Sequence, residues 1–154
     1  MAKFHLVALG GTFDILHKGH FALLQKGFSI SSKVIIGITS DEFATKKGKN
    51  LLHGYLERYN TLESTIKKNF PNSQFEISRL DNDFGPAVLE KEVEALVVSE
   101  ETVEKGQILN KLRLERQLPP VEIVSVPMVL ATDGKRISTS RIKNSEIDAE
   151  GNLR

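Results

Sequence analysis

The sequence predicts an α/β protein with a single domain, residues 1–154, built on one doubly wound parallel sheet of about five strands. Short apolar runs that suit buried strands alternate along the chain with segments whose apolar residues recur at helical spacing. About five strands and five helices in alternation are typical of a parallel sheet with right-handed crossovers. The length of 154 residues is also about that of one domain, and the sequence shows no internal repeat or linker.

The expected strands are short runs rich in apolar or β-branched residues, as in a buried parallel sheet. They cover residues 4–9, 33–39, 75–80, 95–98 and 121–127. Gly10 and Gly11 are expected to end the first strand, and a cluster of turn-forming residues at 81–86 follows the third. These turns mark the ends of strands, and ligands of such sheets bind beside the carboxyl ends of the strands.

The expected helices are the segments in which apolar residues return every three to four positions. They comprise a helix that begins near Gly19 or His20, a helix capped by Ser40, residues 55–70, a short helix or turn at 86–92, residues 103–117 and a short helix opening at 137–142. The basic stretch 46–54 is expected to be a mobile loop. The polar tail, residues 149–154, is expected to be disordered.

The bulk composition excludes several classes of function. A net charge of +1 is too close to neutral for non-specific binding of nucleic acid or an anionic membrane. The absence of cysteine excludes disulfides, thiolate zinc sites and thiol catalysis. No apolar run approaches the roughly 20 residues of a membrane span, and no secretory signal precedes the first strand. We therefore expect a cytoplasmic protein.

The strongest indication of function is the segment 9–20, LGGTFDILHKGH, which joins the first strand to the first helix. Gly10 and Gly11 would let the backbone approach a ligand, and Gly19 would let a nucleotide lie against the helix end. His17 and His20 are three residues apart at the start of a helix, so they share a face. The positive N-terminus of that helix adds attraction for phosphate.

This segment matches neither of the common phosphate-binding patterns. The chain contains no GxxxxGK[ST] sequence, and no GxGxxG sequence follows the first strand. A pair of surface or capping histidines is the simpler interpretation of His17 and His20 taken alone. A zinc site is disfavoured, because the chain lacks cysteine and has only two further histidines, so no bound metal is expected.

Three further sets of residues could contact phosphate oxygens through hydroxyl, amide or cationic donors. They are Ser138, Thr139, Ser140 and Arg141 in the stretch ISTSR; Lys46, Lys47 and Lys49 in the basic loop; and Asn110 with Arg113 on a helix. Taken singly, each set has a plain alternative, namely a serine N-cap with a solvated arginine, a solvated charge run and a solvated helix face. The stretches that follow successive strands, 10–20, 40–47, 81–86, 99–101 and 127–141, are expected to gather at one site.

These stretches together resemble the phosphopantetheine adenylyltransferases of the archaeal and eukaryotic type. That family belongs to the HxGH nucleotidylyltransferase superfamily, which has a Rossmann-like fold. The HxGH motif stands here at residues 17–20, and an ISSTxxR-like motif appears as ISTSRI, with the usual Ser-Thr order exchanged at Thr139 and Ser140. GITSDEF at 37–43, VVSEET at 97–102 and MVLATDGKRIS at 128–138 indicate the branch, whereas DNDFGP at 81–86 departs from the family's DPYGP element.

The resemblance implies transfer of the adenylyl group of ATP to 4′-phosphopantetheine in coenzyme A biosynthesis, with Mg²⁺ accompanying ATP. It implies that His20 and Thr12 contact the reacting phosphates together with Lys46 or Lys47. It places ATP against Gly10, Gly11, His17, Gly19, Asn110, Arg113, Ser138, Thr139, Ser140 and Arg141. A sibling cytidylyl- or adenylyltransferase acting on another small phosphate, and a non-catalytic nucleotide- or CoA-binding module, are the alternatives. The expected assembly is a monomer or small homo-oligomer.

Overall fold

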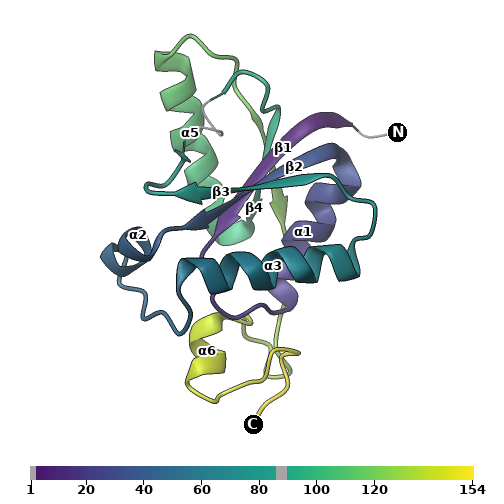
Figure 1. Cartoon of the computed structure of the whole chain (residues 1–154), viewed down its shortest axis with the longest axis vertical. Helices are drawn as coiled ribbons and strands as arrows, with labels where there is room; N and C mark the ends of the chain where they lie inside the picture. The colour runs from purple at the N-terminus through teal and green to yellow at the C-terminus, as the bar shows by residue number, and fades with distance from the viewer. Residues whose placement is uncertain (1–2, 86–89) are drawn as a thin grey trace.

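A computed structural model describes residues 3–85 and 90–154 of the chain and shows one five-stranded sheet (Figure 1). The strands are β1 (Phe4–Gly11), β2 (Ser31–Thr39), β3 (Phe75–Leu80), β4 (Ala95–Ser99) and β5 (Glu122–Val126). Their order is β3-β2-β1-β4-β5, and all four pairings are parallel. The predicted fold class is therefore confirmed, and the winding reverses between β1 and β4.

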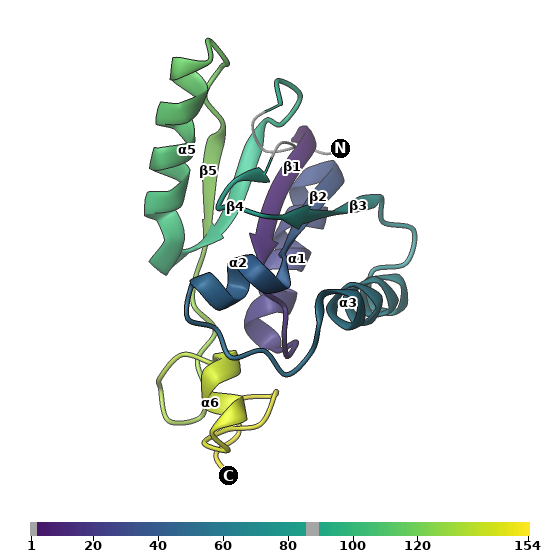
Figure 2. The same cartoon turned by 60° about the vertical axis from the view of Figure 1, so that its left-hand side comes forward.

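Helices cover both faces of this sheet. They are α1 (Lys18–Ile30), α2 (Asp41–Lys46), α3 (Tyr55–Asn69), the 3-10 turn η1 (Glu100–Thr102), α5 (Val103–Glu115) and α6 (Thr139–Lys143). Figure 2 shows α5 on one side of the sheet and α1 with α3 on the other. The short helix or turn expected at 86–92 falls largely on residues 86–89, which lie outside the described residues. Within the described ranges, no helix has both the length and the apolar character that crossing a bilayer requires.

The hydrophobic core is divided between the two faces because successive strand residues point to opposite sides. Val7 and Leu9 of β1 belong to the cluster that packs under α1 and α3, where Leu62 of α3 is fully buried. Ala8, which lies between them, belongs to the cluster on the α5 face together with Leu109. The sheet is thus buried on both faces, as the apolar strand sequences predict.

Two expectations about where a strand ends and a helix begins differ from the structure. β1 does not stop at Leu9 but extends through Gly10 and Gly11, which continue the parallel ladder opposite Gly37 and Ile38 of β2. Helix α1 begins at Lys18 with His17 as its N-cap, one residue before the expected start. The expected Ser40 cap is confirmed, since its hydroxyl accepts a hydrogen bond from the amide of Phe43.

A small third cluster follows β5 and lies below the sheet, at the C-terminal end of the chain (Figure 1). Ala131, Ile137 and Ile147 form its centre. In place of the disordered tail expected for 149–154, the structure has a hydrogen-bonded turn, in which Gly151 accepts from the amide of Thr132. Gly151 has a φ of 86°, and a Cβ there would lie 2.7 Å from Ile137, so this close packing requires glycine.

Candidate active site

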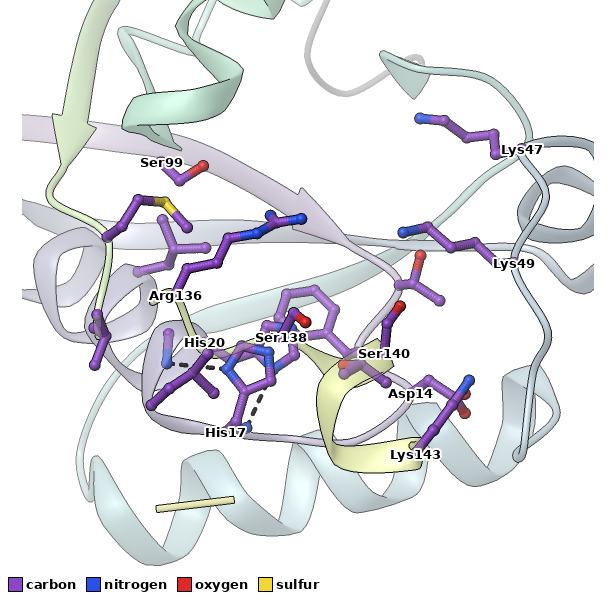
Figure 3. A pocket seen from close by; sticks show the side chains of 18 of the residues that line it. Asp14, His17, His20, Lys47, Lys49, Ser99, Arg136, Ser138, Ser140 and Lys143 are labelled. Atoms are coloured by element: carbon purple, nitrogen blue, oxygen red, sulfur yellow. Dashed lines mark hydrogen bonds and ion pairs between the residues drawn. The ribbon is translucent and has the colours of Figure 1, made fainter. Parts of the chain in front are cut away.

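A cavity of about 530 Å³ opens at the carboxyl ends of the strands, beside the reversal between β1 and β4. This volume lies in the range of small-molecule sites, and the position is the one where doubly wound sheets bind ligands. The lining comes from the β1–α1 turn, the loop after α2, the end of β4 and the segments after β5 (Figure 3). Its polar residues are Thr12, Asp14, His17, His20, Lys47, Lys49, Asn50, Ser99, Arg136, Ser138, Thr139, Ser140, Lys143 and Asn144.

The two histidines of the HxGH motif close the first turn of α1. The Nδ1 atom of His17 accepts a hydrogen bond of 3.0 Å from the amide of Gly19, and the Nδ1 atom of His20 accepts one of 3.3 Å from the amide of His17 (Figure 3). Their rings stack with centroids 3.9 Å apart. Because each Nδ1 is an acceptor, a neutral ring carries its proton on Nε2. Each histidine therefore offers one N–H donor for a ligand.

Burial keeps both rings neutral at physiological pH. Desolvation, followed by the charge of His17, lowers the pKa of His20 to about 3. Desolvation, followed by the positive charge of Arg136, lowers the pKa of His17 to about 4. The pair can donate hydrogen bonds to phosphate over a wide pH range, but it cannot serve as a cationic acid near pH 7.

Gly19 lines the cavity, as its expected role requires, and it is also needed by the histidine cap. A Cβ at Gly19 would lie 2.9 Å from the His17 ring, so a side chain there would displace the cap. Gly10 and Gly11 do not line the cavity, contrary to their expected role. A Cβ at Gly10 would lie 3.2 Å from Leu80, and one at Gly11 would lie 3.2 Å from the Phe13 ring. All three glycines make room for protein neighbours.

The turn after β1 is held in a strained conformation. Phe13 is buried and has a φ of 54°, in the left-handed region that bulky residues rarely occupy. Its ring lies 4.9 Å from the ring of His20, so the strained turn supports the histidine. Thr12 accepts a hydrogen bond of 3.2 Å from the Thr39 hydroxyl, which leaves the Thr12 hydroxyl proton available to a ligand. Strained backbone of this kind concentrates at functional sites.

Arg58 of α3 supports this turn from below and was not identified from the sequence. Its side chain is fully buried and donates to the carbonyl oxygens of Thr12 (2.9 Å), Thr39 (2.8 Å) and His53 (3.1 Å). It also forms an ion pair with Asp41 at 2.8 Å. The sequence did contain a signal for the burial of Arg58, because position 58 lies four residues before the core residue Leu62 and therefore on the same helix face.

The second half of the cavity comes from residues 136–144. The Ser138 hydroxyl caps α6 by accepting from the amide of Arg141, and the Thr139 hydroxyl donates to the carbonyl of Ile15 at 3.2 Å. The structure thus brings Ser138, Thr139 and Ser140 to the same cavity as the HxGH histidines, which lie about 120 residues earlier.

Arginine positions in this segment differ from the expectation. Arg141 does not line the cavity, because it pairs with Asp133 and donates to the carbonyl of Arg136 at 2.8 Å. Arg136 lines the cavity instead (Figure 3). It forms an ion pair of 2.6 Å with Glu101 of η1. The sequence pattern favoured Arg141, which belongs to the ISTSR stretch, and did not identify Arg136, which stands just before it.

The remaining expected residues separate into two groups. Lys47 and Lys49 line the cavity, whereas the exposed Lys46 does not, and Lys47 pairs with Asp83 at 2.9 Å. Asn110 and Arg113 also lie away from the cavity lining. Their role is structural: Asn110 exchanges two hydrogen bonds with the backbone of Val121, at 3.0 and 2.7 Å. Arg113 is buried and donates to the carbonyl of Pro119 at 2.7 Å.

The cavity presents donors and cations rather than metal ligands. Among the described residues that line it, Asp14 is the only carboxylate, and its oxygens accept from the amides of Leu52 (2.9 Å) and His53 (3.0 Å). Residues 3–85 and 90–154 hold no cluster of three or more histidine or acidic side chains that could bind a metal ion. A divalent cation at this site would accordingly arrive on a polyphosphate ligand.

Comparison with known proteins agrees with this geometry. Residues 8–145 match the family described as cytidylyltransferase-like. The phosphopantetheine adenylyltransferase of Methanothermobacter thermautotrophicus is 39% identical over 151 residues, covering 98% of this chain and 90% of the relative. That of Methanopyrus kandleri is 37% identical over 148 residues, covering 96% and 94%. A crystal structure of an Archaeoglobus fulgidus protein of unknown function superposes with a TM-score of 0.73 at 27% identity, covering 88% of this chain and all of the other.

The neutral, buried His17 should make stability depend on pH. The unfolded ring binds a proton below about pH 6.5, whereas the folded ring stays neutral down to about pH 4, so stability falls as the pH drops between these values. His17→Asn keeps a capping oxygen and removes the titration. Between pH 7 and 4.5, the wild type should lose on the order of 2 kcal/mol more unfolding free energy than the variant, as measured by urea denaturation.

His5→Asn is the matched control, because it makes the same substitution at an exposed histidine. Equal acid sensitivity of the wild type and His17→Asn would contradict the neutral state of the capped ring.

Proposed function

The chain belongs to the cytidylyltransferase-like family, among the phosphopantetheine adenylyltransferases, and on this basis we propose that it transfers the adenylyl group of ATP to 4′-phosphopantetheine. The products are dephospho-CoA and pyrophosphate. One observation carries the proposal: His17 and His20 share a cavity with Ser138, Thr139 and Ser140 at the winding reversal of the sheet. That arrangement surrounds a polyphosphate with hydrogen-bond donors from two sides.

The reaction that we propose fits a cavity in which the described lining residues offer no free base, since the Nδ1 atoms of the histidines and the oxygens of Asp14 already accept hydrogen bonds. An oxygen of the acceptor's phosphate forms a bond to the α-phosphorus of ATP, and the bond from that phosphorus to the bridging oxygen of pyrophosphate breaks. The acceptor phosphate is already ionised near neutral pH, so no side chain has to remove a proton. Catalysis then consists of positioning the reactants and stabilising charge on the transferring and leaving phosphates.

The two halves of the cavity together supply donors for this reaction. We assign the Nε2–H of His20 and the Thr12 hydroxyl to the transferring α-phosphate and the attacking phosphate. His17, Ser138 and Ser140 are assigned to the β- and γ-phosphates. Neutral imidazole donors suit this task because they stabilise developing negative charge without giving up a proton.

Cationic groups complete the proposed site. Lys47 and Lys49 are assigned to the reacting phosphates, since both line the cavity opposite the histidines, and Arg136 is assigned to the triphosphate (Figure 3). Mg²⁺ is treated as part of the ATP substrate, held by triphosphate oxygens and water, because the only lining carboxylate, among the residues described, is engaged by backbone amides. The proposal includes a cytoplasmic location and a monomer or small homo-oligomer.

The decisive test is a coupled pyrophosphate-release assay of the purified protein. ATP or CTP is offered with 4′-phosphopantetheine, glycerol 3-phosphate or nicotinamide mononucleotide. Release should occur with ATP and 4′-phosphopantetheine, and dephospho-CoA should accumulate in equal amount. Turnover with CTP or another acceptor would identify a sibling transferase, and tight ATP binding without turnover on any acceptor would identify a binding module.

Substitution of His20 tests the role of the neutral donor. His20→Ala should lower kcat by roughly 10²–10³-fold, the usual cost of removing one donor to a transition state. The thermal midpoint of the variant shows whether the fold persists, and exposed His5→Ala is the control. An unchanged kcat would remove His20 from the mechanism.

The loop lysines provide an internal comparison. Lys47→Ala and Lys49→Ala should each reduce kcat/KM by at least about tenfold, because each removes a cation beside developing phosphate charge. Lys46→Ala should change it little, because this neighbour lies outside the cavity lining. Steady-state kinetics with both substrates varied will give kcat/KM for each of the three variants. A larger loss in Lys46→Ala than in the other two would contradict the assignment of Lys47 and Lys49 to the reacting phosphates.

A further inference from the structure

Because α2 extends to Lys46, the basic loop is shorter than the expected stretch 46–54 and covers residues 47–53. A buried carboxylate, that of Asp14, attaches it to the rest of the cavity. The Asp14 side chain is 3% exposed. Its Oδ2 atom accepts from the amide of Leu52 at 2.9 Å, and its Oδ1 atom accepts from the amide of His53 at 3.0 Å. The Nδ1 atom of His53 lies 2.9 Å from the carbonyl oxygen of Asp14 and 3.2 Å from Oδ1, so the ring donates to the same residue.

Lys143 of α6 joins the other half of the cavity to this attachment. Its Nζ atom lies 2.5 Å from Oδ2 of Asp14 and also donates to the carbonyl of Asn50 in the basic loop. Figure 3 shows the Lys143 and Asp14 side chains side by side at the edge of the cavity. One ammonium group therefore contacts the β1–α1 turn and the backbone of the loop, and it comes from the C-terminal segment that carries Ser138 and Ser140.

These contacts keep the Asp14 carboxylate charged and hydrogen-bonded at both oxygens. Burial alone would raise the pKa of Asp14, but hydrogen bonds from Lys143 and from the amides of Leu52 and His53 hold it below the ordinary value. Both carboxylate oxygens have donors, so neither is available as a general base or metal ligand. An ion pair of this burial is costly to break on one side only, because the remaining charge loses its partner.

We propose that Asp14 and Lys143 act as a positioning pair that fixes the basic loop against both halves of the cavity. Through this pair Lys47 and Lys49 are held at the distance from which they can reach the reacting phosphates. Asp14 and Lys143 act through the loop, and neither takes part in the chemical step. The catalytic part of this inference rests on the proposed function, whereas the attachment of the loop can be measured without any substrate.

The alternative is that Lys143, which lines the cavity, binds phosphate by itself. The two roles differ in how substitutions combine. If the residues act as a pair, Asp14→Asn already releases the loop, and adding Lys143→Met costs little more. If Lys143 binds phosphate independently, the two effects add in free energy, and ATP binding weakens in every protein that lacks the lysine.

The experiment compares the wild type with Asp14→Asn, Lys143→Met, the double variant and Lys143→Arg. Exposed Lys111→Met on α5 is the matched control for loss of one lysine charge. Hydrogen exchange of the Leu52 and His53 amides in the ligand-free protein reports attachment of the loop. Steady-state kinetics gives kcat and the KM for ATP.

We expect Asp14→Asn and Lys143→Met each to speed exchange at the two amides at least about tenfold. Each should lower kcat by roughly 10–100-fold with a nearly unchanged KM for ATP, since small displacements of catalytic groups have effects of this size. The double variant should be no worse than the more severe single variant. Lys143→Arg should keep amide exchange and kcat close to the wild-type values, and Lys111→Met should match the wild type in both.

Unchanged amide exchange in Lys143→Met, or additive losses with a raised KM for ATP, would overturn the positioning role. If Asp14→Asn does not fold, Lys143→Met and Lys143→Arg still decide the question. If the wild type transfers no adenylyl group to any acceptor, the proposed function fails, and the exchange readout alone decides whether the pair holds the loop.

Discussion

The guanidinium of Arg58 is the constraint on which the cavity floor depends. Parallel strands end together at one edge of a sheet, where their last carbonyl oxygens lack ladder partners. Arg58 supplies donors for the carbonyl of Thr12, directly after β1, for that of Thr39, the last residue of β2, and for that of His53. Its charge is offset by Asp41. A buried arginine with these acceptors fixes three positions relative to one another, and two of the segments concerned, the β1–α1 turn and the loop that leads to His53, contribute to the cavity lining.

The electrostatic design of the cavity follows from which groups are buried and which are at the surface. His20 lies against the apolar Phe13 ring and stacks on His17, and both histidines are neutral, so they add donors without adding charge to the interior. Lys47 and Arg136 are partly exposed, where water lowers the cost of their charge, and each has an acidic partner. A polyphosphate ligand would exchange these exposed ion pairs for contacts with its own oxygens, an exchange that costs little because surface pairs are weak.

The two halves of the site meet because of the order of the strands. Since β4 and β5 lie on the opposite side of β1 from β2 and β3, the segment after β5 returns across the carboxyl end of β1. The bond between Thr139 and Ile15 joins residues 124 positions apart. The tail reinforces this return, because Gly151 packs on Ile137 next to the Ser138 cap. Residues that look peripheral in the sequence therefore belong to the framework of the cavity.

The sequence by itself determined the strands, the main helices and the fold class, because these depend on local periodicity and on residues that interrupt it. It also indicated the HxGH turn and the ISTSR stretch, where several phosphate-binding residue types gather in a few positions. Tertiary structure alone decided which of these side chains reach the cavity. Arg136 lines it and Arg141 does not, because Asp133 pairs with the latter. Asn110 and Arg113 are held by the chain leading into β5, and Gly10, Gly11 and Gly19 make room for protein side chains. The physical reason is that residue type sets what a side chain can bind, whereas its partners, often far along the chain, decide what it does bind.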